Sequence, residues 1–511
     1  MNVGSLLPWH ARFRPDHVAV ICGEERLTFA ELEQRVNRLA NALLRLGLTK
    51  GDKLALVLPN CTELLSAYRA AALLGIVVVP LSPLLRGSGL VSLLRDSEST
   101  AVIASPAMTE ALDEARVELP EIPAGNYVLT DSTSGGGYRS YAELTAAETT
   151  EPPPAVDIAD DDVYNIVYSS GTTGSPKGIV HTHYIRGMYC TMFASSFRFT
   201  PESVVMHAGS LVFNGSFVTL MPAWYLGCTY ILQQKFDAVE FIETVAREKV
   251  THVMMVPSQI VAVINAPNFS VEKLESLRML CSVGAPWHRE HKERLIPLLP
   301  DSLYELYGLT EGFITILDSR DFVAKIDSVG TPIPFTEMRI VGDDGVELPA
   351  GEVGEITGRG PMLMPGYYKR PDLTSQAIVD GWLHTGDVGF ADDDGFLHLV
   401  DRKKDMIISG GVNVFPKDIE EIVVNHPAVR EVAVYGVPSE KWGECPVAAV
   451  ILRVPGGVEP GELKTWINAR VAASYQKVHE VVIADDFPRN TAGKTLKRVL
   501  RETHGLATVH S

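Results

Sequence analysis

Cysteine is scarce in this chain and lacks the spacing of a metal or disulfide site. The 511 residues hold six cysteines and no Cys-x-x-Cys pair. Zinc modules and disulfide-rich secreted domains both need closely spaced cysteines, so the sequence argues against both and favours a cytoplasmic protein. The pair His181 and His183 does not suggest zinc either. Side chains two residues apart do not share a helix face, and no third ligand is spaced nearby.

Positive charge is also in short supply. The chain has 45 Lys and Arg against 63 Asp and Glu, which gives a formal net charge of −18. A protein without a basic field has little means of recruiting a polyanion. We therefore expect neither nucleic acid nor an anionic membrane as a partner, and any phosphate ligand must be held locally.

Long apolar runs are missing as well. The longest, near residues 70–81, contains Gly75 and Pro80 and is too short to span a bilayer. The first residues lack the charged start and apolar core of an export signal. With 46% hydrophobic and 21% charged residues, the composition is that of an ordinary globular protein. The sequence thus predicts no membrane span and no export.

Helix-like and strand-like segments alternate along much of the chain. Residues 27–48 have the apolar spacing of a helix, and residues 52–58 have the composition of a short buried strand. The alternation continues through residues 63–80 and returns near residues 251–256. This pattern predicts an α/β fold of largely parallel, helix-covered sheets, in which ligands bind at the carboxyl ends of strands.

The chain is too long for one hydrophobic core, and its composition and expected secondary structure change along its length. Residues 132–162, rich in Ser, Gly, Thr, Glu and Pro, are predicted to form a surface connector. From about residue 331, short β-like runs separated by turns indicate a small β subdomain. We predict a large N-terminal domain of stacked α/β subdomains with this β subdomain over residues 1–400, and a small α+β C-terminal domain over residues 401–511.

The most informative segment is the loop at residues 169–178, which follows a strand-like run and is rich in hydroxyl side chains and glycine. Glycines let backbone N–H groups turn around an anion, hydroxyls donate to phosphate oxygens, and Lys177 can neutralise charge. A P-loop is excluded because Lys177 precedes Gly178 instead of following the second glycine of that motif. The alternative is a polar surface turn. The pattern favours a polyphosphate-binding loop.

Four further segments carry nucleotide-binding residue types. Tyr307, Thr310 and Glu311 offer, after a predicted strand, a ring to cover adenine, a hydroxyl for phosphate and a carboxylate for Mg²⁺. Asp387 could accept two ribose hydroxyls, although Asp in a Gly-flanked turn more often bonds its own backbone. A charged run at residues 401–404 and a glycine-lysine loop at residues 488–494 are weak signals when taken singly.

Taken in order, these segments resemble the adenylate-forming superfamily of acyl-CoA synthetases, peptide-synthetase adenylation domains and firefly luciferase. The resemblance covers nearly the whole chain and is most like a stand-alone acyl-CoA ligase. It implies that a carboxylate attacks ATP to give acyl-AMP and pyrophosphate, and that a thiol then displaces AMP. The matching segments are residues 168–178, 284–286, 307–311, 351–355, 366–369, 382–389, 401–416, 440–444 and 488–494.

The resemblance also implies roles for individual residues. Lys177, Thr310, Glu311 and Lys494 would be catalytic, with Glu311 binding Mg²⁺ and Lys494 bridging the acid carboxylate and the α-phosphate. Asp387 and Arg402 would hold the ribose. The implied ATP and AMP site consists of Ser169, Ser170, Gly171, Thr172, Thr173, Gly174, Lys177, Gly284, Ala285, Pro286, Tyr307, Thr310, Asp387, Arg402 and Lys494.

A mobile C-terminal domain is a further implication of the resemblance. Asp401 matches the hinge about which this domain rotates between the two half-reactions. The rotation would carry Lys494 away and bring Ser409, Gly410 and Gly411 toward the thiol, where glycine lets a pantetheine arm pass close to the backbone.

The acid substrate is indicated only in outline. Asn214 lacks the charge that would pair with an amino acid's ammonium group, so an amino-acid substrate is disfavoured. Apolar neighbours indicate a hydrophobic acid, whether aryl, alicyclic or fatty, although such residues can equally be ordinary core. The candidate acid pocket consists of Phe213, Asn214, Phe217, Val283, Gly284, Gly308 and Phe313.

The acceptor is predicted to be free coenzyme A, since no carrier-protein domain follows. Two alternatives stay open: a stand-alone adenylation enzyme that loads a carrier protein, and an enzyme or binder that performs only one half-reaction on an acyl-adenylate. A serine hydrolase is disfavoured because the chain has no GxSxG elbow. The sequence leaves room for a homodimer.

Overall fold

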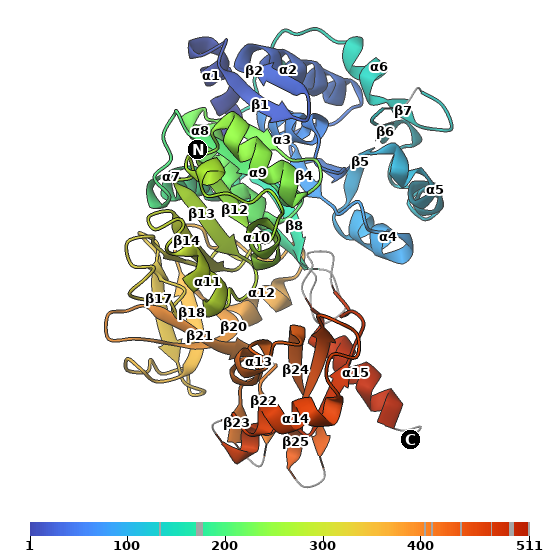
Figure 1. Ribbon diagram of the computed structural model, residues 1–511. Coiled ribbons are helices and arrows are strands. Elements are labelled where there is room, and N and C mark those ends of the chain that lie inside the picture. Colours follow the sequence, from blue (N-terminus) through green and yellow to red (C-terminus); the bar gives the residue numbers. More distant parts are fainter. Residues whose placement is uncertain are drawn as a thin grey trace. The chain divides into compact units, whose positions relative to one another are not determined.

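The computed structural model describes residues 1–131, 134–169, 177–402, 405–409, 412–439, 442–471, 473–489 and 495–508 (Figure 1). The chain divides into two compact units. The first comprises Met1–Ile326, Gly330–Glu337 and Arg359–Leu383, and the second comprises Asp327–Val329, Met338–Gly358 and His384–Ser511. The predicted domain boundary at Asp401 stays a prediction.

Two large sheets form the framework of the first unit, and most of their strand pairs are parallel. The first sheet runs in the order β16 (Thr331–Pro332), β15 (Ile314–Leu317), β14 (Leu303–Gly308), β13 (Met279–Val283), β12 (His252–Met255), β10 (Val204–His207), β11 (Thr229–Leu232), β1 (Val18–Cys22) and β2 (Glu25–Thr28). The second runs in the order β7 (Arg139–Ser140), β6 (Tyr127–Leu129), β5 (Ser99–Ala104), β3 (Lys53–Val57), β4 (Val77–Pro80), β8 (Val163–Ser169) and β9 (Lys177–Thr182).

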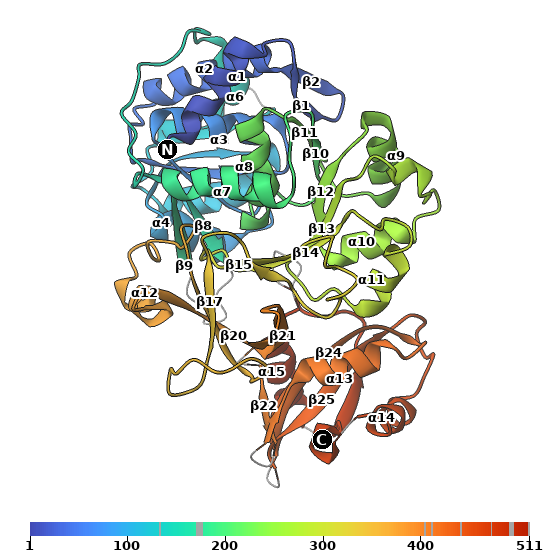
Figure 2. The same ribbon diagram turned by 90° about the vertical axis from the view of Figure 1, so that its left-hand side faces the viewer.

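Helices cover these sheets and share a core with them. Figure 2 shows α7 (His183–Ser196) and α8 (Phe217–Leu226) side by side over these sheets. Residues of β3, β4, β8, β10 and β12 belong to one buried apolar cluster together with residues of α7, α8, α2 (Phe29–Arg45) and α3 (Thr62–Leu74). A sheet covered on its faces by helices buries nearly continuous apolar strands. The helices of this unit are α1 (Leu6–Phe13), α2 (Phe29–Arg45), α3 (Thr62–Leu74), α4 (Gly87–Asp96), α5 (Thr109–Glu118), α6 (Tyr141–Ala146), α7 (His183–Ser196), α8 (Phe217–Leu226), α9 (Ala238–Glu248), α10 (Pro257–Ile264), α11 (Arg289–Leu295) and α12 (Pro371–Ala377).

Local sequence explains several element boundaries. Helix α2 begins after a capping box, in which Thr28 accepts from the Glu31 backbone N–H and the Glu31 carboxylate accepts from the Thr28 N–H. Helix α3 ends at Gly75, which adopts a left-handed conformation. The predicted connector is partly wrong, because β7 and α6 lie within it. Ser140 caps α6, and Tyr141 is buried in the core.

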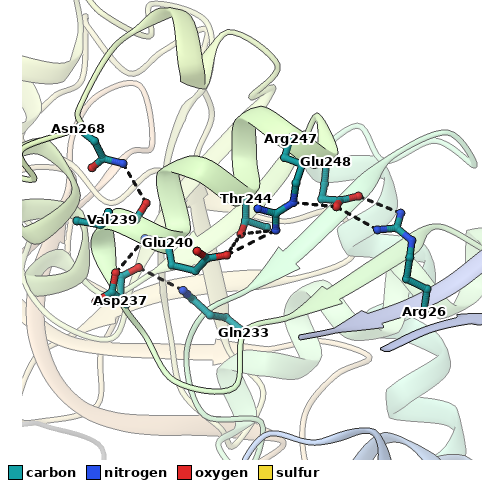
Figure 3. A network of polar contacts seen from close by, with 9 residues as sticks. All are labelled: Arg26, Gln233, Asp237, Val239, Glu240, Thr244, Arg247, Glu248 and Asn268. Carbon is teal, nitrogen blue, oxygen red and sulfur yellow. Dashed lines mark hydrogen bonds and ion pairs between the residues drawn. The ribbon is translucent and has the colours of Figure 1, made fainter. Parts of the chain in front are cut away.

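Helix α9 is held at both ends by polar contacts (Figure 3). Asp237 caps its first turn by accepting from the Glu240 backbone N–H at 2.9 Å. At the other end, Arg26 of β2 donates to both carboxylate oxygens of Glu248, each at 3.0 Å. Bidentate geometry gives such a pair specificity, so the contact fixes where α9 lies against the edge strand of the sheet.

The second unit is built on smaller, mainly antiparallel sheets. One contains β17 (Glu337–Val341), β18 (Gly354–Arg359), β20 (Trp382–Ala391) and β21 (Leu397–Arg402), and β19 (Ile378–Val379) pairs with the first residues of β20. The other contains β23 (Val412–Val414), β22 (Ile407–Ser409), β25 (Gly443–Leu452), β24 (Val429–Ser439) and β26 (Glu480–Ile483). The helices of this unit are α13 (Pro416–Val424), α14 (Pro460–Asn468) and α15 (Lys497–Thr508).

The predicted mixed α/β fold is confirmed by this arrangement of sheets and helices. Within the residues that the structure describes, none of the helices combines the length and apolarity needed to cross a bilayer.

Candidate active site

The predicted phosphate loop connects the two strands of a β-hairpin. Strands β8 and β9 are antiparallel, and Ser169 lies opposite Lys177 where the hairpin opens into the loop. The structure therefore brings the two ends of the loop together. Ser170, Gly171, Thr172, Thr173 and Gly174 lie outside the described residues.

The loop end of this hairpin is anchored by a partly buried carboxylate. Asp96, the last residue of α4, accepts from the Tyr168 hydroxyl at 2.7 Å and from Arg370 Nη2 at 2.9 Å. Burial, and then the hydrogen bond to Asp96, raise the pKa of Tyr168, so the hydroxyl stays protonated and keeps donating. The backbone N–H of Tyr368 also donates to the Gly178 carbonyl at 2.7 Å. The segment at residues 366–370 thus supports the start of β9.

Thr310 and Glu311 follow β14 and are held from two sides. The Tyr367 hydroxyl donates to Glu311 Oε1 at 2.9 Å, and the Met364 N–H donates to the Glu311 carbonyl at 2.8 Å. His181 Nε2 lies 2.8 Å from the Thr310 carbonyl oxygen. Because a carbonyl can only accept, this nitrogen carries the proton. Both candidate catalytic residues therefore have fixed positions.

Tyr367 also connects Glu311 with Lys177. The Lys177 ammonium lies 5.2 Å from the centroid of the Tyr367 ring, within the range of a cation–π contact. The hydroxyl of the same ring bonds Glu311. The structure therefore brings two predicted catalytic residues, from β9 and from the turn after β14, to one tyrosine.

The residue after Glu311 must be glycine. Gly312 has φ +118°, and a Cβ added there would lie 2.1 Å from the Met362 carbonyl oxygen. This close approach places the backbone of the Thr310–Glu311 turn against residues 362–363. A side chain at this position would displace the turn.

The residues predicted to frame adenine lie at the ends of adjacent strands. Gly284, Ala285 and Pro286 follow β13, and Tyr307 lies near the end of β14, which pairs with β13 in parallel. The carboxyl ends of parallel neighbours meet at one edge of a sheet. The structure thus places these residues at the same sheet edge from which the Thr310–Glu311 turn follows.

The candidate acid pocket combines partly exposed and buried residues. Phe213 and Asn214 are half-buried at the turn before α8, and Val283 is half-buried at the end of β13. Phe217 and Phe313 are almost wholly buried, with exposures of 0% and 1%. Gly308 is an exposed residue at the end of β14. The two buried phenylalanines therefore belong to the core. The sequence left this open as the alternative to a place in the acid pocket.

Asn214 is fixed by two hydrogen bonds. Its side-chain oxygen accepts from Arg186 Nη2 at 2.9 Å, and its side-chain nitrogen donates to the Tyr189 hydroxyl at 3.1 Å. Both partners belong to α7. The amide therefore has one defined orientation.

The predicted ribose residues belong to the second unit. Asp387 of β20 is buried and lies opposite Arg402 of β21 in the antiparallel register, and Asp401 lies opposite Val388. Ser409 lies in β22 and is buried. Gly410, Gly411 and Lys494 lie outside the described residues.

Three residues of this site were missed by sequence reasoning: Tyr367, His181 and Arg186. The hydrogen bond from His181 to Thr310 joins positions 129 residues apart. A single sequence carries no signal for such a pairing. In the sequence, the pair His181 and His183 suggests no role other than a metal site. In the structure, His181 holds the backbone of Thr310 by a hydrogen bond.

Comparison with known proteins shows the family of this chain. The family described as AMP-binding enzyme matches residues 7–368, and the AMP-binding enzyme C-terminal domain matches residues 418–494. A feruloyl-CoA synthase of Amycolatopsis is 35% identical over 513 residues, and a long-chain-fatty-acid–CoA ligase, FadD13 of Mycobacterium tuberculosis, is 35% identical over 516 residues. Each alignment covers 99% of both chains.

The fold of solved relatives is also similar. ATP-bound MatB from Rhodopseudomonas palustris has a TM-score of 0.89 at 28% identity, with 99% of both chains covered. MenE of Bacillus subtilis, in complex with its acyl-adenylate intermediate, has a TM-score of 0.87 at 28% identity, with 97% of both covered. The chain belongs to the AMP-binding enzyme family. More narrowly, it is an AMP-forming acid–thiol ligase of the acyl-CoA synthetase type, as the sequence predicts.

Proposed function

We propose that this enzyme uses Mg-ATP to activate a hydrophobic carboxylic acid as acyl-AMP and then transfers the acyl group to free coenzyme A. The observation that carries the proposal is the contact of Tyr367 with both Glu311 and Lys177. Such a cluster joins a cation and a carboxylate at the end of the hairpin that bears the predicted phosphate loop.

The chemistry needs positioning and charge neutralisation more than covalent catalysis. A carboxylate is a poor electrophile, and converting it to an adenylate supplies a good leaving group. In the proposal Lys177 lies beside the pyrophosphate, the Thr310 hydroxyl donates to phosphate, and Tyr307 covers adenine. Lys494 approaches the attacking carboxylate, where a mobile cation can follow developing negative charge.

Glu311 is the proposed protein ligand of Mg²⁺. Its carboxylate is a hard oxygen ligand, and the Tyr367 hydroxyl limits its rotation. Mg²⁺ is usually held by one or two carboxylates together with substrate phosphates, so one anchored carboxylate beside a phosphate loop fits. When bound, the ion would neutralise charge on the leaving pyrophosphate.

The proposed acid is hydrophobic and aryl, alicyclic or fatty. Support comes from the apolar residues Phe213, at the turn before α8, and Val283, at the end of β13, and from the neutral side chain of Asn214. Relatives named as feruloyl-CoA synthase and as long-chain-fatty-acid–CoA ligase bracket this range.

Rotation about Asp401 between the half-reactions is part of the proposal. It would exchange Lys494 for Ser409, Gly410 and Gly411, so that coenzyme A meets the adenylate. We also propose a cytoplasmic location, which the six unpaired cysteines support. A homodimer stays a prediction.

One experiment tests the proposal. The purified protein is incubated with Mg-ATP and a panel of aryl, alicyclic and fatty acids, with and without coenzyme A, while pyrophosphate, acyl-AMP and acyl-CoA are followed separately. We expect pyrophosphate and acyl-AMP without coenzyme A, and acyl-CoA with it. Conversion of supplied acyl-AMP to thioester without any pyrophosphate from the panel would overturn two-step catalysis. Transfer to a pantetheinylated carrier in preference to coenzyme A would assign the enzyme to carrier loading.

A further inference from the structure

A fully buried arginine of the first unit contacts both Asn214 of the candidate acid pocket and His181, which holds the backbone of Thr310. Arg186 belongs to α7 and has an exposure of 0%. Its guanidinium lies 4.0 Å from the centroid of the Phe217 ring and 4.7 Å from that of Tyr189. Arginine stacks well on aromatic faces because its planar cation is weakly hydrated.

The hydrogen-bond partners of this guanidinium are all neutral. Nε donates to Asn165 Oδ1 at 3.0 Å, and Nη2 donates both to Asn214 Oδ1 at 2.9 Å and to His181 Nδ1 at 3.2 Å. Nη1 has no hydrogen-bond partner within the described residues. Burying a cation without a carboxylate partner is unfavourable. Stability alone therefore gives little reason for an arginine here.

The first branch of these contacts reaches the acid pocket. Arg186 holds the oxygen of Asn214, and Tyr189 holds its nitrogen. Loss of the guanidinium would leave one end of the amide without its donor. The side chain of Asn214 could then turn, and the shape of the candidate pocket would change.

The second branch reaches the nucleotide motif. His181 is also fully buried, and burial followed by the charge of Arg186 lowers its pKa well below the usual value. The neutral ring accepts from Arg186 at Nδ1 and donates from Nε2 to the Thr310 carbonyl at 2.8 Å. Arg186 thereby selects the tautomer that holds the backbone next to Glu311.

We propose that Arg186 is a positioning residue for both substrates, which orients Asn214 for the acid and, through His181, the Thr310–Glu311 turn for Mg-ATP. The inference rests on the proposed function, because it takes Asn214 to border the acid. It assigns to one side chain a link between the two binding sites. The role requires the planar guanidinium, whose Nη2 donates to both Asn214 and His181, and not the charge alone.

The test measures the two sites separately. The dissociation constant of Mg-ATP is measured by calorimetry without acid, and the KM of an acid accepted by the wild-type enzyme is measured at saturating ATP. For Arg186→Met we expect both constants to rise about tenfold, as for the loss of a hydrogen bond to a charged group. Asn214→Ala should raise the KM of the acid alone, and His181→Leu the dissociation constant of Mg-ATP alone.

A matched control is available in the same unit. Arg69 of α3 is also buried, with its guanidinium 4.1 Å from the Trp224 ring centroid. Arg69→Met removes a buried stacked arginine without touching Asn214, His181 or Thr310, and both constants should stay within about twofold of wild type. Equal effects of Arg69→Met and Arg186→Met would overturn the inference.

Arg186→Lys keeps the charge and tests whether the charge or the planar guanidinium is required. Lysine lacks the planar fork, so this variant should raise both constants nearly as much as Arg186→Met. It also decides the test if Arg186→Met does not fold. Wild-type constants in Arg186→Lys, or a change in only one constant, would overturn the inference. Absence of pyrophosphate from the wild-type enzyme across the acid panel would instead contradict the proposed function.

Discussion

The Tyr367 hydroxyl donates a 2.9 Å hydrogen bond to Glu311 Oε1. Tyr367 is 8% exposed, and burial together with the nearby carboxylate raises its pKa. The hydroxyl therefore stays protonated at physiological pH and remains a donor. A carboxylate that would ligate a metal is thus oriented by a neutral side chain.

Removing this hydroxyl should weaken the use of Mg²⁺. Tyr367→Phe keeps the ring beneath Lys177 but loses the bond to Glu311, and we expect the Mg²⁺ concentration for half-maximal pyrophosphate release to rise about tenfold. Calorimetric binding of ATP over a range of Mg²⁺ concentrations should show the same shift. Tyr368→Phe is the control, because the Tyr368 hydroxyl bonds Glu98 and not Glu311. An unchanged Mg²⁺ requirement in Tyr367→Phe would contradict the assigned role.

Gly312→Ala should disrupt the turn that carries Glu311. The added Cβ meets the Met362 carbonyl at 2.1 Å and sits at positive φ, so overpacking and backbone strain together should cost about 3 kcal/mol. Gly47→Ala is the control: its φ is +87°, with nothing within 4 Å of the added Cβ. That change should cost about 1 kcal/mol. Chemical denaturation compares the two, and equal losses would argue against the clash.

Lys494 should matter far more for the first half-reaction than for the second. We expect Lys494→Ala to slow pyrophosphate release by about 10²–10³-fold, the usual effect of removing one group that stabilises developing charge. Thioester formation from supplied acyl-AMP and coenzyme A should fall much less. Equal losses in the two assays would refute the proposed role.

Stability should decrease as the pH falls from 7 to 5. Burial lowers the pKa of His183, His207 and His252 to about 4, whereas an unfolded histidine titrates near 6.5. Between pH 4 and pH 6.5 the unfolded chain binds more protons than the folded chain. The free energy of unfolding therefore decreases as the pH is lowered, by up to about 1.4 kcal/mol per pH unit for each histidine. Tm measured against pH should show the decline.

A single substitution checks the origin of this pH dependence. His252 Nε2 donates to the Phe197 carbonyl at 3.0 Å, and glutamine also offers a donor. His252→Gln should therefore make the decline of Tm between pH 7 and pH 5 shallower. An unaltered slope would assign the effect to other groups.

Much of the fold is predictable because it depends on local patterns. The helical spacing of residues 27–48 corresponds to α2, and the apolar run of residues 52–58 corresponds to β3. The composition of residues 169–178 is also local, and the two described ends of this loop, Ser169 and Lys177, lie opposite each other, whereas its phosphate-binding role stays a prediction. The connector at residues 132–162 was only partly right, since the burial of Tyr141 depends on distant helix α2 and its core.

The contacts that shape the site could not be predicted in the same way. Glu311 meets Tyr367 across 56 residues, and Arg186 meets Asn214 across 28. Such pairings depend on which strand ends the topology brings together, and helical or strand periodicity within one segment does not report that. The sequence therefore predicts the motif residues from their chemistry, whereas the side chains that hold them in place are visible only in the structure.

The position of β9 at the end of its sheet has a consequence for solubility. An edge strand offers unpaired backbone groups to other chains. Here the Val180 N–H donates to the Gly366 carbonyl, the Tyr368 N–H donates to the Gly178 carbonyl, and Ile179 forms a bridge with Tyr367. The segment at residues 366–368, which includes the tyrosine that orients Glu311, thus also covers the edge of β9. Substitutions that weaken this pairing should promote aggregation as well as impair catalysis.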